Sequence, residues 1–185
     1  MRARMISVKS LPLALSAMVA LACLTGCNNG SSPSADGPLS SSSNRHGTIP
    51  NGSQCVPGGR TQTFGDQLFT NFGNTVVVLD RVVLLHPHHQ RLIGSYAVPG
   101  DLLVGAPGGW PPKYQGIPPG WKHRQPVHGF RVAPGKAFNM VLGIVATTPA
   151  RATSEGMLLY YHDSSGTYVA KNYFANIIAA STKGC

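Results

Sequence analysis

The chain has 185 residues, with 15 Lys and Arg against six Asp and Glu, and a formal net charge of +9. This length is enough for one domain with a substantial hydrophobic core. The sequence contains no Gly-x-Ser-x-Gly elbow, no phosphate-cradling glycine loop and no dinucleotide fingerprint, which argues against the common hydrolase and nucleotide-binding classes.

The amino-terminal segment has the pattern of a secretory signal. Arg2, Arg4 and Lys9 form a basic region without acids, and residues 11–24 are apolar except for one serine. The apolar run is shorter than the roughly 20 residues that a spanning helix needs. We therefore expect residues 1–26 to be a cleaved leader rather than a buried helix.

The end of this run, Leu24-Thr25-Gly26-Cys27, resembles the bacterial lipobox, a Leu-small-Gly/Ala-Cys cleavage motif. The resemblance implies that Cys27 receives a diacylglycerol and becomes the first of 185 − 26 = 159 mature residues. One acyl chain binds a membrane marginally, whereas two anchor a protein stably. Membrane lipid is thus an expected partner through Cys27, on the extracytoplasmic face of the cell membrane.

Residues 27–53 follow the leader and are dominated by Ser, Gly, Asn and Pro. Such a composition buries too little apolar surface to offset the entropy of ordering the chain. We expect a flexible tether here, with an ordered loop of the domain as the alternative.

Two cysteines remain once Cys23 leaves with the leader and Cys27 carries lipid. Cys55 and Cys185 bracket the apolar part of the chain, in a compartment where disulfides persist. We expect a disulfide between them, with two free thiols as the alternative. Neither cysteine has a second Cys or His at ligand spacing, so a metal pair has little support.

Residues 54–185 show a β pattern, and we expect an antiparallel immunoglobulin-like β-sandwich of about seven to nine strands. The expected strands are Leu68–Phe72, Thr75–Leu85, Arg91–Val98, Asp101–Ala106, His128–Ala133, Lys136–Thr147, Gly156–His162 and Thr167–Phe174. Thr75–Leu85 is apolar on both faces, as in a strand between two layers. In Lys136–Thr147, Phe138, Met140, Leu142 and Ile144 alternate on one face. Residues 174–181 are either a strand or one helical turn.

The whole layout is similar to that of small immunoglobulin-like lipoproteins of high-GC Gram-positive bacteria. The similarity rests on Asn71-Phe72-Gly73 between two strands and on the Tyr-rich hairpin Tyr160–Tyr173. It implies the fold and a lipid anchor, and it implies no activity or substrate.

Three histidines, His86, His88 and His89, are the candidate metal ligands because imidazole binds copper and zinc. Strand alternation would place His86 and His88 on one face and His89 on the other. We expect a solvated strand end, and keep a metal carrier or a hydrolase as the alternative function. We expect no cofactor.

The net charge is concentrated in one interval. No acid lies between Asp101 and Glu155, whereas six basic residues do. The mature chain has 12 basic and six acidic residues, so the remainder balances at 6 − 6 = 0. Long-range attraction for an anionic ligand would come from this interval.

Within this interval, residues 105–125 are too rich in Pro and Gly for regular structure, and we expect a long loop. The loop carries aromatic and basic side chains in alternation, which suit stacking on sugar rings, anionic polymers or a partner's groove. These candidate ligand-binding residues are Trp110, Lys113, Tyr114, Trp121, Lys122 and Arg124. The alternative is that the indoles fold back to cap one end of the sandwich.

From these patterns we expect a non-catalytic binding or accessory module, not an enzyme. The expected ligand is an anionic cell-envelope component or a protein partner. Nucleic acid also suits the chemistry, but the extracytoplasmic compartment argues against it.

The anchor is testable by Cys27→Ser. The serine hydroxyl cannot form the thioether, so the variant should leave the membrane fraction or accumulate with its leader uncut. Fractionation and the mass of the amino-terminal peptide measure this. A variant that is cut normally and stays membrane-bound would contradict the lipoprotein interpretation.

Overall fold

The computed structural model describes residues 32–41, 52–101, 104, 105, 108–113, 118, 120–180, 184 and 185. The chain divides into two units, Met1–Gly30 and Ser31–Cys185, and every described residue belongs to the second. The predicted leader 1–26 and residues 27–31 and 42–51 of the predicted tether, Cys27 among them, therefore lie outside the described residues. None of the described helices is both long and apolar enough to cross a membrane.

The described residues form an all-β sandwich. Three sheets have the orders β1-β3-β8-β5-β6, β11-β10-β4-β7 and β2-β12-β9. The strands are β1 (Leu39–Ser40), β2 (Ser53–Pro57), β3 (Thr61–Asn71), β4 (Val77–Leu85), β5 (Gln90–Pro99), β6 (Gln125–Pro126), β7 (Arg131–Val132), β8 (Ala137–Ala146), β9 (Ala152–Ser154), β10 (Gly156–His162), β11 (Thr167–Asn172) and β12 (Ala175–Ala179), with one 3-10 turn, η1 (Trp121–His123). Eight of these described strands have five or more residues. All the pairings are antiparallel except that of β12 with β2.

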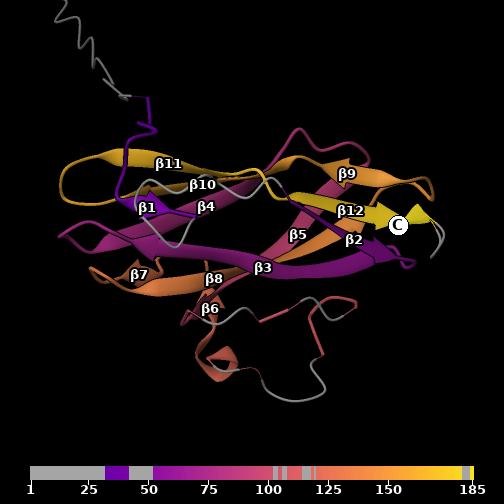
Figure 1. Ribbon diagram of the computed structural model, residues 1–185, viewed down its shortest axis with the longest axis horizontal. Coiled ribbons are helices and arrows are strands. Elements are labelled where there is room, and N and C mark those ends of the chain that lie inside the picture. The colour runs from indigo at the N-terminus through magenta and orange to yellow at the C-terminus, as the bar shows by residue number, and fades with distance from the viewer. Residues whose placement is uncertain are drawn as a thin grey trace, which may run out of the picture. The chain divides into compact units, whose positions relative to one another are not determined.

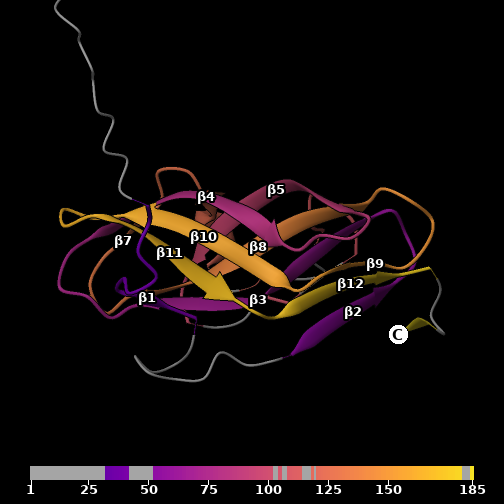
Figure 2. The ribbon, with the colours of Figure 1, turned by 90° about the horizontal axis from the view of Figure 1, so that it is seen from above.

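The layers are visible in the ribbon views. In Figure 1, β10 and β11 lie above β3 and β8, and β2, β9 and β12 lie together near the carboxyl terminus. Seen from above, β10 and β11 lie over β3 and β8 (Figure 2). The carboxyl-terminal stretch that the sequence left open is strand β12.

The core lies between the two larger sheets. Phe138, Met140, Leu142 and Ile144 of β8 are fully buried on its inner face, as the alternation predicted. Each such side chain contributes about 1.5–3 kcal/mol through burial of its apolar surface. Strand β4 differs from its prediction, since only alternate residues are buried and Val83 is 41% exposed. Strand β4 belongs to the four-stranded sheet, which has the core on one face. No described element covers the other face of this sheet, so the alternate residues of β4 are exposed there.

Asn71 connects the two larger sheets at the end of β3. Its side chain is fully buried and its Nδ2 donates to the carbonyls of Thr75 and Val132, at 2.9 and 3.0 Å. Its Oδ1 accepts the N–H of Gly73 at 2.9 Å. The Asn-x-Gly motif thus closes the β3–β4 turn and ties it to β7, and its polar atoms all find partners, as buried amides require.

Residues 32–41, which we call the strap, differ from the flexible tether that the composition predicted. Ser34 forms a parallel bridge with Tyr168 of β11, and β1 pairs with β3. Leu39 is buried, and its N–H donates to the Tyr161 hydroxyl at 3.1 Å. Burial raises the pKa of Tyr161 to about 12, although the hydrogen bond from Leu39 acts in the opposite direction.

A close fit holds the strap in this place. A side chain at Gly37 would meet the Tyr161 hydroxyl at 2.1 Å and the Tyr168 ring at 2.7 Å, so only glycine fits there. The composition argument fails for the strap because one buried leucine and two sheet edges supply the contacts that the polar sequence lacks. Strand β2 likewise begins at Ser53, the last residue of the predicted tether.

Cys55 and Cys185 form a disulfide with Cα atoms 5.6 Å apart, the pairing that the sequence predicted. Cys55 lies on β2, which pairs with β12 close to the carboxyl terminus. The bond therefore joins the first long strand of the domain to its last residue.

Removing this disulfide should reduce stability strongly. It closes a loop with a sequence separation of 130, and the chain-entropy model assigns such a loop about 4–5 kcal/mol. We expect Cys55→Ser with Cys185→Ser to lower the free energy of unfolding by this amount, measured in equilibrium denaturant unfolding as a fall in the midpoint. The unreduced wild-type domain should weigh two hydrogens less than the reduced form. Native labelling of both thiols would contradict the bond.

Candidate functional site

The outer face of the five-stranded sheet carries a second, smaller apolar cluster. Val98 of β5 and Val141 of β8 are fully buried there, together with Val104 from the following loop. Tyr96, Trp110 and Trp121 pack against them and are half-buried. In Figure 1 the segment with η1 lies below the sheet, on the side opposite β10 and β11.

Trp110 lies flat against the sheet because two paired strands both carry glycine beneath it. Gly94 of β5 and Gly143 of β8 are register partners. A Cβ at Gly143 would meet the indole at 2.2 Å, and one at Gly94 would meet it at 2.6 Å. Glycine in a strand often marks such a close approach. The indole thus fills the space left by two absent side chains.

Three further side chains extend this contact outward. The Tyr96 ring stacks on Trp110 with centroids 5.3 Å apart, and Trp121 meets Tyr96 edge-on at 5.8 Å. The Arg124 guanidinium lies 4.6 Å from the Trp121 ring and 5.5 Å from that of Tyr96. Guanidinium groups over aromatic faces in this range make favourable cation–π contacts.

We call this set the aromatic-basic surface. It consists of Tyr96, Trp110, Trp121, Lys122 and Arg124. Lys122 and Arg124 are exposed, and so is Lys113 at the start of the loop. Tyr114 lies outside the described residues.

For the tryptophans, the sequence left open whether they are exposed for binding or fold back onto the sandwich, and the structure shows features of both. The indoles fold back, but they cover a sheet face rather than one end of the sandwich, and they keep part of their surface exposed. Sequence reasoning missed Tyr96 and the pair Gly94 and Gly143. The glycines within two predicted strands were the available signal.

A hollow of about 570 Å³ lies next to this surface. Its lining includes the basic residues Arg131 and Lys136, the acidic residue Asp101, and Gln125, which follows Arg124 in the sequence. The positive charge of the acid-free interval therefore continues from η1 into a concave region.

The three histidines lie at an exposed turn. His86 Nδ1 is 2.7 Å from Glu155 Oε2, and the rings of His88 and His89 lie 4.0 Å apart. The expected alternation fails because His86 and His89 have φ of 44° and 54°, in the left-handed region. Within the described part of the chain, no three His, Cys, Asp or Glu side chains form a group that could hold a metal ion.

A second acid–imidazole pair lies on the four-stranded sheet. His162 Nδ1 is 2.9 Å from Asp80 Oδ1, and His128 Nδ1 is 3.1 Å from the Asp80 carbonyl. A carboxylate at Nδ1 fixes the orientation and tautomer of an imidazole, as in catalytic triads. The sequence offered His128 and His162 only as further histidines that could join a metal site, and it did not predict the pairing of His162 with Asp80.

No protein-family model and no curated protein matches the chain. Similar solved structures include the Vibrio cholerae VesB protease, with 9% identity and a TM-score of 0.38, matched over 69% of this chain and 29% of that one. A human CEP192 PapD-like domain has 11% identity and a TM-score of 0.36, over 95% and 96% of the two chains. The secreted serine protease VesC from Vibrio cholerae has 15% identity and a TM-score of 0.28, over 67% and 21%.

Two of these three structures are proteases, and this finding contradicts the prediction that the chain is not an enzyme. That prediction relied on missing sequence motifs, whereas catalytic geometry is set by the fold and not by the order of residues. We therefore withdraw it. Similarity at these TM-scores assigns no catalytic role, and the chain spans less than a third of either protease.

The glycine pair under Trp110 can be tested with Gly143→Ala. The new methyl group overlaps the indole, so the loop should lift from the sheet at a cost of about 1–3 kcal/mol. Thermal unfolding and a red shift of tryptophan fluorescence measure this. Gly108→Ala is the control, because its Cβ would stay 3.7 Å from Gln62. Equal behaviour of the two variants would contradict the packing described here.

Proposed function

We propose that this chain is a membrane-anchored extracytoplasmic lipoprotein that binds an anionic cell-envelope polymer through its aromatic-basic surface. The observation that carries the proposal is the stack of Trp110, Tyr96, Trp121 and Arg124 on an outer sheet face. All of these residues except Tyr96 lie in the interval without acids. The half-exposed aromatic rings can stack on the rings of a ligand. The nearby cations attract anionic groups, and added salt screens this attraction.

The strap supports a polymer rather than the anchoring bilayer as the ligand. Ser34 contacts β11 of the four-stranded sheet, whereas the aromatic-basic surface covers the outer face of the other sheet. If Cys27 carries the lipid, 34 − 27 = 7 residues separate the anchor from this contact, and they span about 25 Å at most. The strap's first contact, at Ser34, then lies on the four-stranded sheet, whereas the proposed contact surface lies on the outer face of the five-stranded sheet, which the strap joins later through β1.

The test uses residues 31–185, which form a compact unit with their own core and disulfide. The probes are a soluble polyphosphodiester, a polyuronate and neutral dextran. We expect weak binding to the two polyanions at low salt, a loss on raising salt, and no binding to dextran, as measured by calorimetry. Binding to anionic vesicles alone, or to dextran equally, would contradict the proposal.

Arg124→Ala is the informative variant, and Arg81→Ala is its matched control. Arg81 also lies over a tyrosine ring, 4.1 Å from that of Tyr160, but on the four-stranded sheet. We expect Arg124→Ala to weaken polyanion binding about five- to tenfold, which corresponds to roughly 1 kcal/mol. Arg81→Ala should leave it unchanged, and both variants should unfold near the wild-type temperature. Equal losses would assign binding to net charge instead of this surface.

A further inference from the structure

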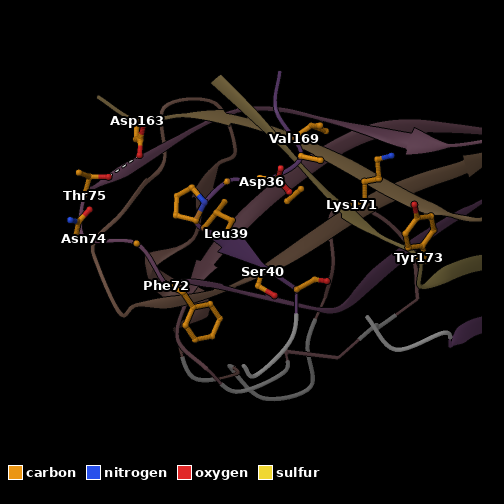
Figure 3. A pocket seen from close by; sticks show the side chains of 16 residues that line it. Asp36, Leu39, Ser40, Phe72, Asn74, Thr75, Asp163, Val169, Lys171 and Tyr173 are labelled. Carbon is orange, nitrogen blue, oxygen red and sulfur yellow. Dashed lines mark hydrogen bonds between the residues drawn. The ribbon is translucent and has the colours of Figure 1, made fainter. Parts of the chain in front are cut away.

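A cleft of about 760 Å³ lies on the other side of the molecule, between the strap and strand β11. Figure 3 shows its lining, with Asp163 and Thr75 at one end, Lys171 and Tyr173 at the other, and Leu39 between them. Its volume is in the range of ligand-binding pockets. Tyr173 is 42% exposed at the rim.

The Asp163 carboxylate, which lines the cleft, already accepts hydrogen bonds from the β10–β11 turn and from Thr75. Its Oδ1 accepts the N–H groups of Ser165 and Gly166, at 2.7 and 3.1 Å, and its Oδ2 accepts the Thr75 hydroxyl at 2.8 Å. Although burial acts to raise it, these hydrogen bonds hold the pKa of Asp163 below its ordinary value. The charged side chains left for a ligand are the exposed Asp36 of the strap and Lys171 at the opposite end of the cleft.

The edge of β11 supplies backbone groups at that end. A strand residue directs its N–H and C=O to one edge, and successive residues alternate between the two edges. Thr167 C=O and Val169 N–H already face the strap, because they bond Ser34 N–H and C=O at 3.1 and 2.8 Å. Val169 C=O and Lys171 N–H therefore face the same edge, beyond the point where the strap leaves it.

Within the described part of the chain, no hydrogen bond reaches these two groups from the strap. The strap turns away from the β11 edge after Ser34, where Asp36 N–H donates a hydrogen bond to the Ser34 hydroxyl at 3.1 Å. The chain then continues through Gly37 to Leu39, which is buried in the sandwich. The isolated bridge at Ser34 shows that this edge already pairs with one residue of a segment that runs parallel to β11. The edge continues along Val169 and Lys171, both of which line the cleft.

We propose that this edge binds an extended peptide segment of a partner protein by strand addition. Val169 C=O and Lys171 N–H would pair with the peptide backbone, as in recognition by β-augmentation. The cleft beside Leu39 and Phe72 would take an apolar side chain. The exposed Lys171 ammonium, which forms no salt bridge within the described residues, favours an acidic side chain at the neighbouring position. This inference does not depend on the lipid anchor or on the polymer.

The experiment uses residues 31–185 and a blocked pentapeptide, acetyl-TVEVT-amide, as the probe. We expect weak binding in which the NMR signal of the Lys171 amide shifts and its hydrogen exchange slows. The Ala170 amide should not change, because it faces β10 within the sheet. Absence of binding, or shifts only at Thr167 and Val169, as expected if the peptide displaced the strap, would overturn the proposal.

Two substitutions at one position separate backbone pairing from charge. Lys171→Pro removes the edge N–H, and proline is tolerated at such a position of an edge strand, so the variant should stay folded. It should lose at least tenfold in affinity, whereas Lys171→Ala should lose no more than about threefold, the contribution of one exposed charge. Equal affinities of the two variants would overturn the proposal.

A change in the probe keeps the test valid if Lys171→Pro fails to fold. N-methylation of the peptide at alternate positions blocks one edge of its backbone at a time. Against the wild-type protein, one set of N-methyl positions should abolish binding and the other should retain it. Equal tolerance of both sets would show that no strand is added, and would overturn the proposal.

Discussion

Strand β8 is buried on both faces, and the rest of the structure depends on this constraint. Its inner residues, from Phe138 to Ile144, form the centre of the core, while Val141 and Gly143 lie under the loop on the outer side. A strand in a two-layer sandwich normally presents one face to the core and one to water. Here a third layer, made by the segment that carries Trp110 and the 3-10 turn η1, covers the second face.

This third layer explains how a segment rich in proline and glycine can hold aromatic side chains in place. Within the described part of this loop, backbone hydrogen bonds hold the turn around η1, from Pro118 to Arg124, whereas each proline lacks a backbone donor. The paired glycines Gly94 and Gly143 give the Trp110 indole a flat seat, and Tyr96 then positions Trp121 and Arg124. The same contacts hold the loop on the sheet and form the aromatic-basic surface. Trp110 therefore chiefly supports this surface, while the exposed side chains of Arg124 and Lys122 can contact a ligand. A substitution at Trp110 would therefore confuse stability with binding.

The strap gives the opposite side of the molecule a different chemistry. It closes part of the gap between β3 and β11. Within the described part of the chain, no backbone group pairs with Val169 C=O or Lys171 N–H on the β11 edge beside the cleft. Exposed edges invite unwanted pairing, and natural proteins keep them short or place lysine on them. Lys171 is such a residue, and the length of free edge is correspondingly small. The two surfaces belong to different sheets, so the molecule could hold a polymer and a peptide at the same time.

The sequence by itself determined the features that depend on local pattern. Alternation placed the inner face of β8, the β-branched run placed β4, and cysteine counting paired Cys55 with Cys185, because these follow from residues close in the chain or from elimination. Composition also located the loop and its cations. Only the tertiary structure decided what packs across distance: that Leu39 is buried, that Trp110 rests on two strand glycines, and that the histidine turn breaks its alternation. A local pattern states which face is apolar. It does not state which distant segment will cover that face, because this depends on the space that the assembled sheets leave.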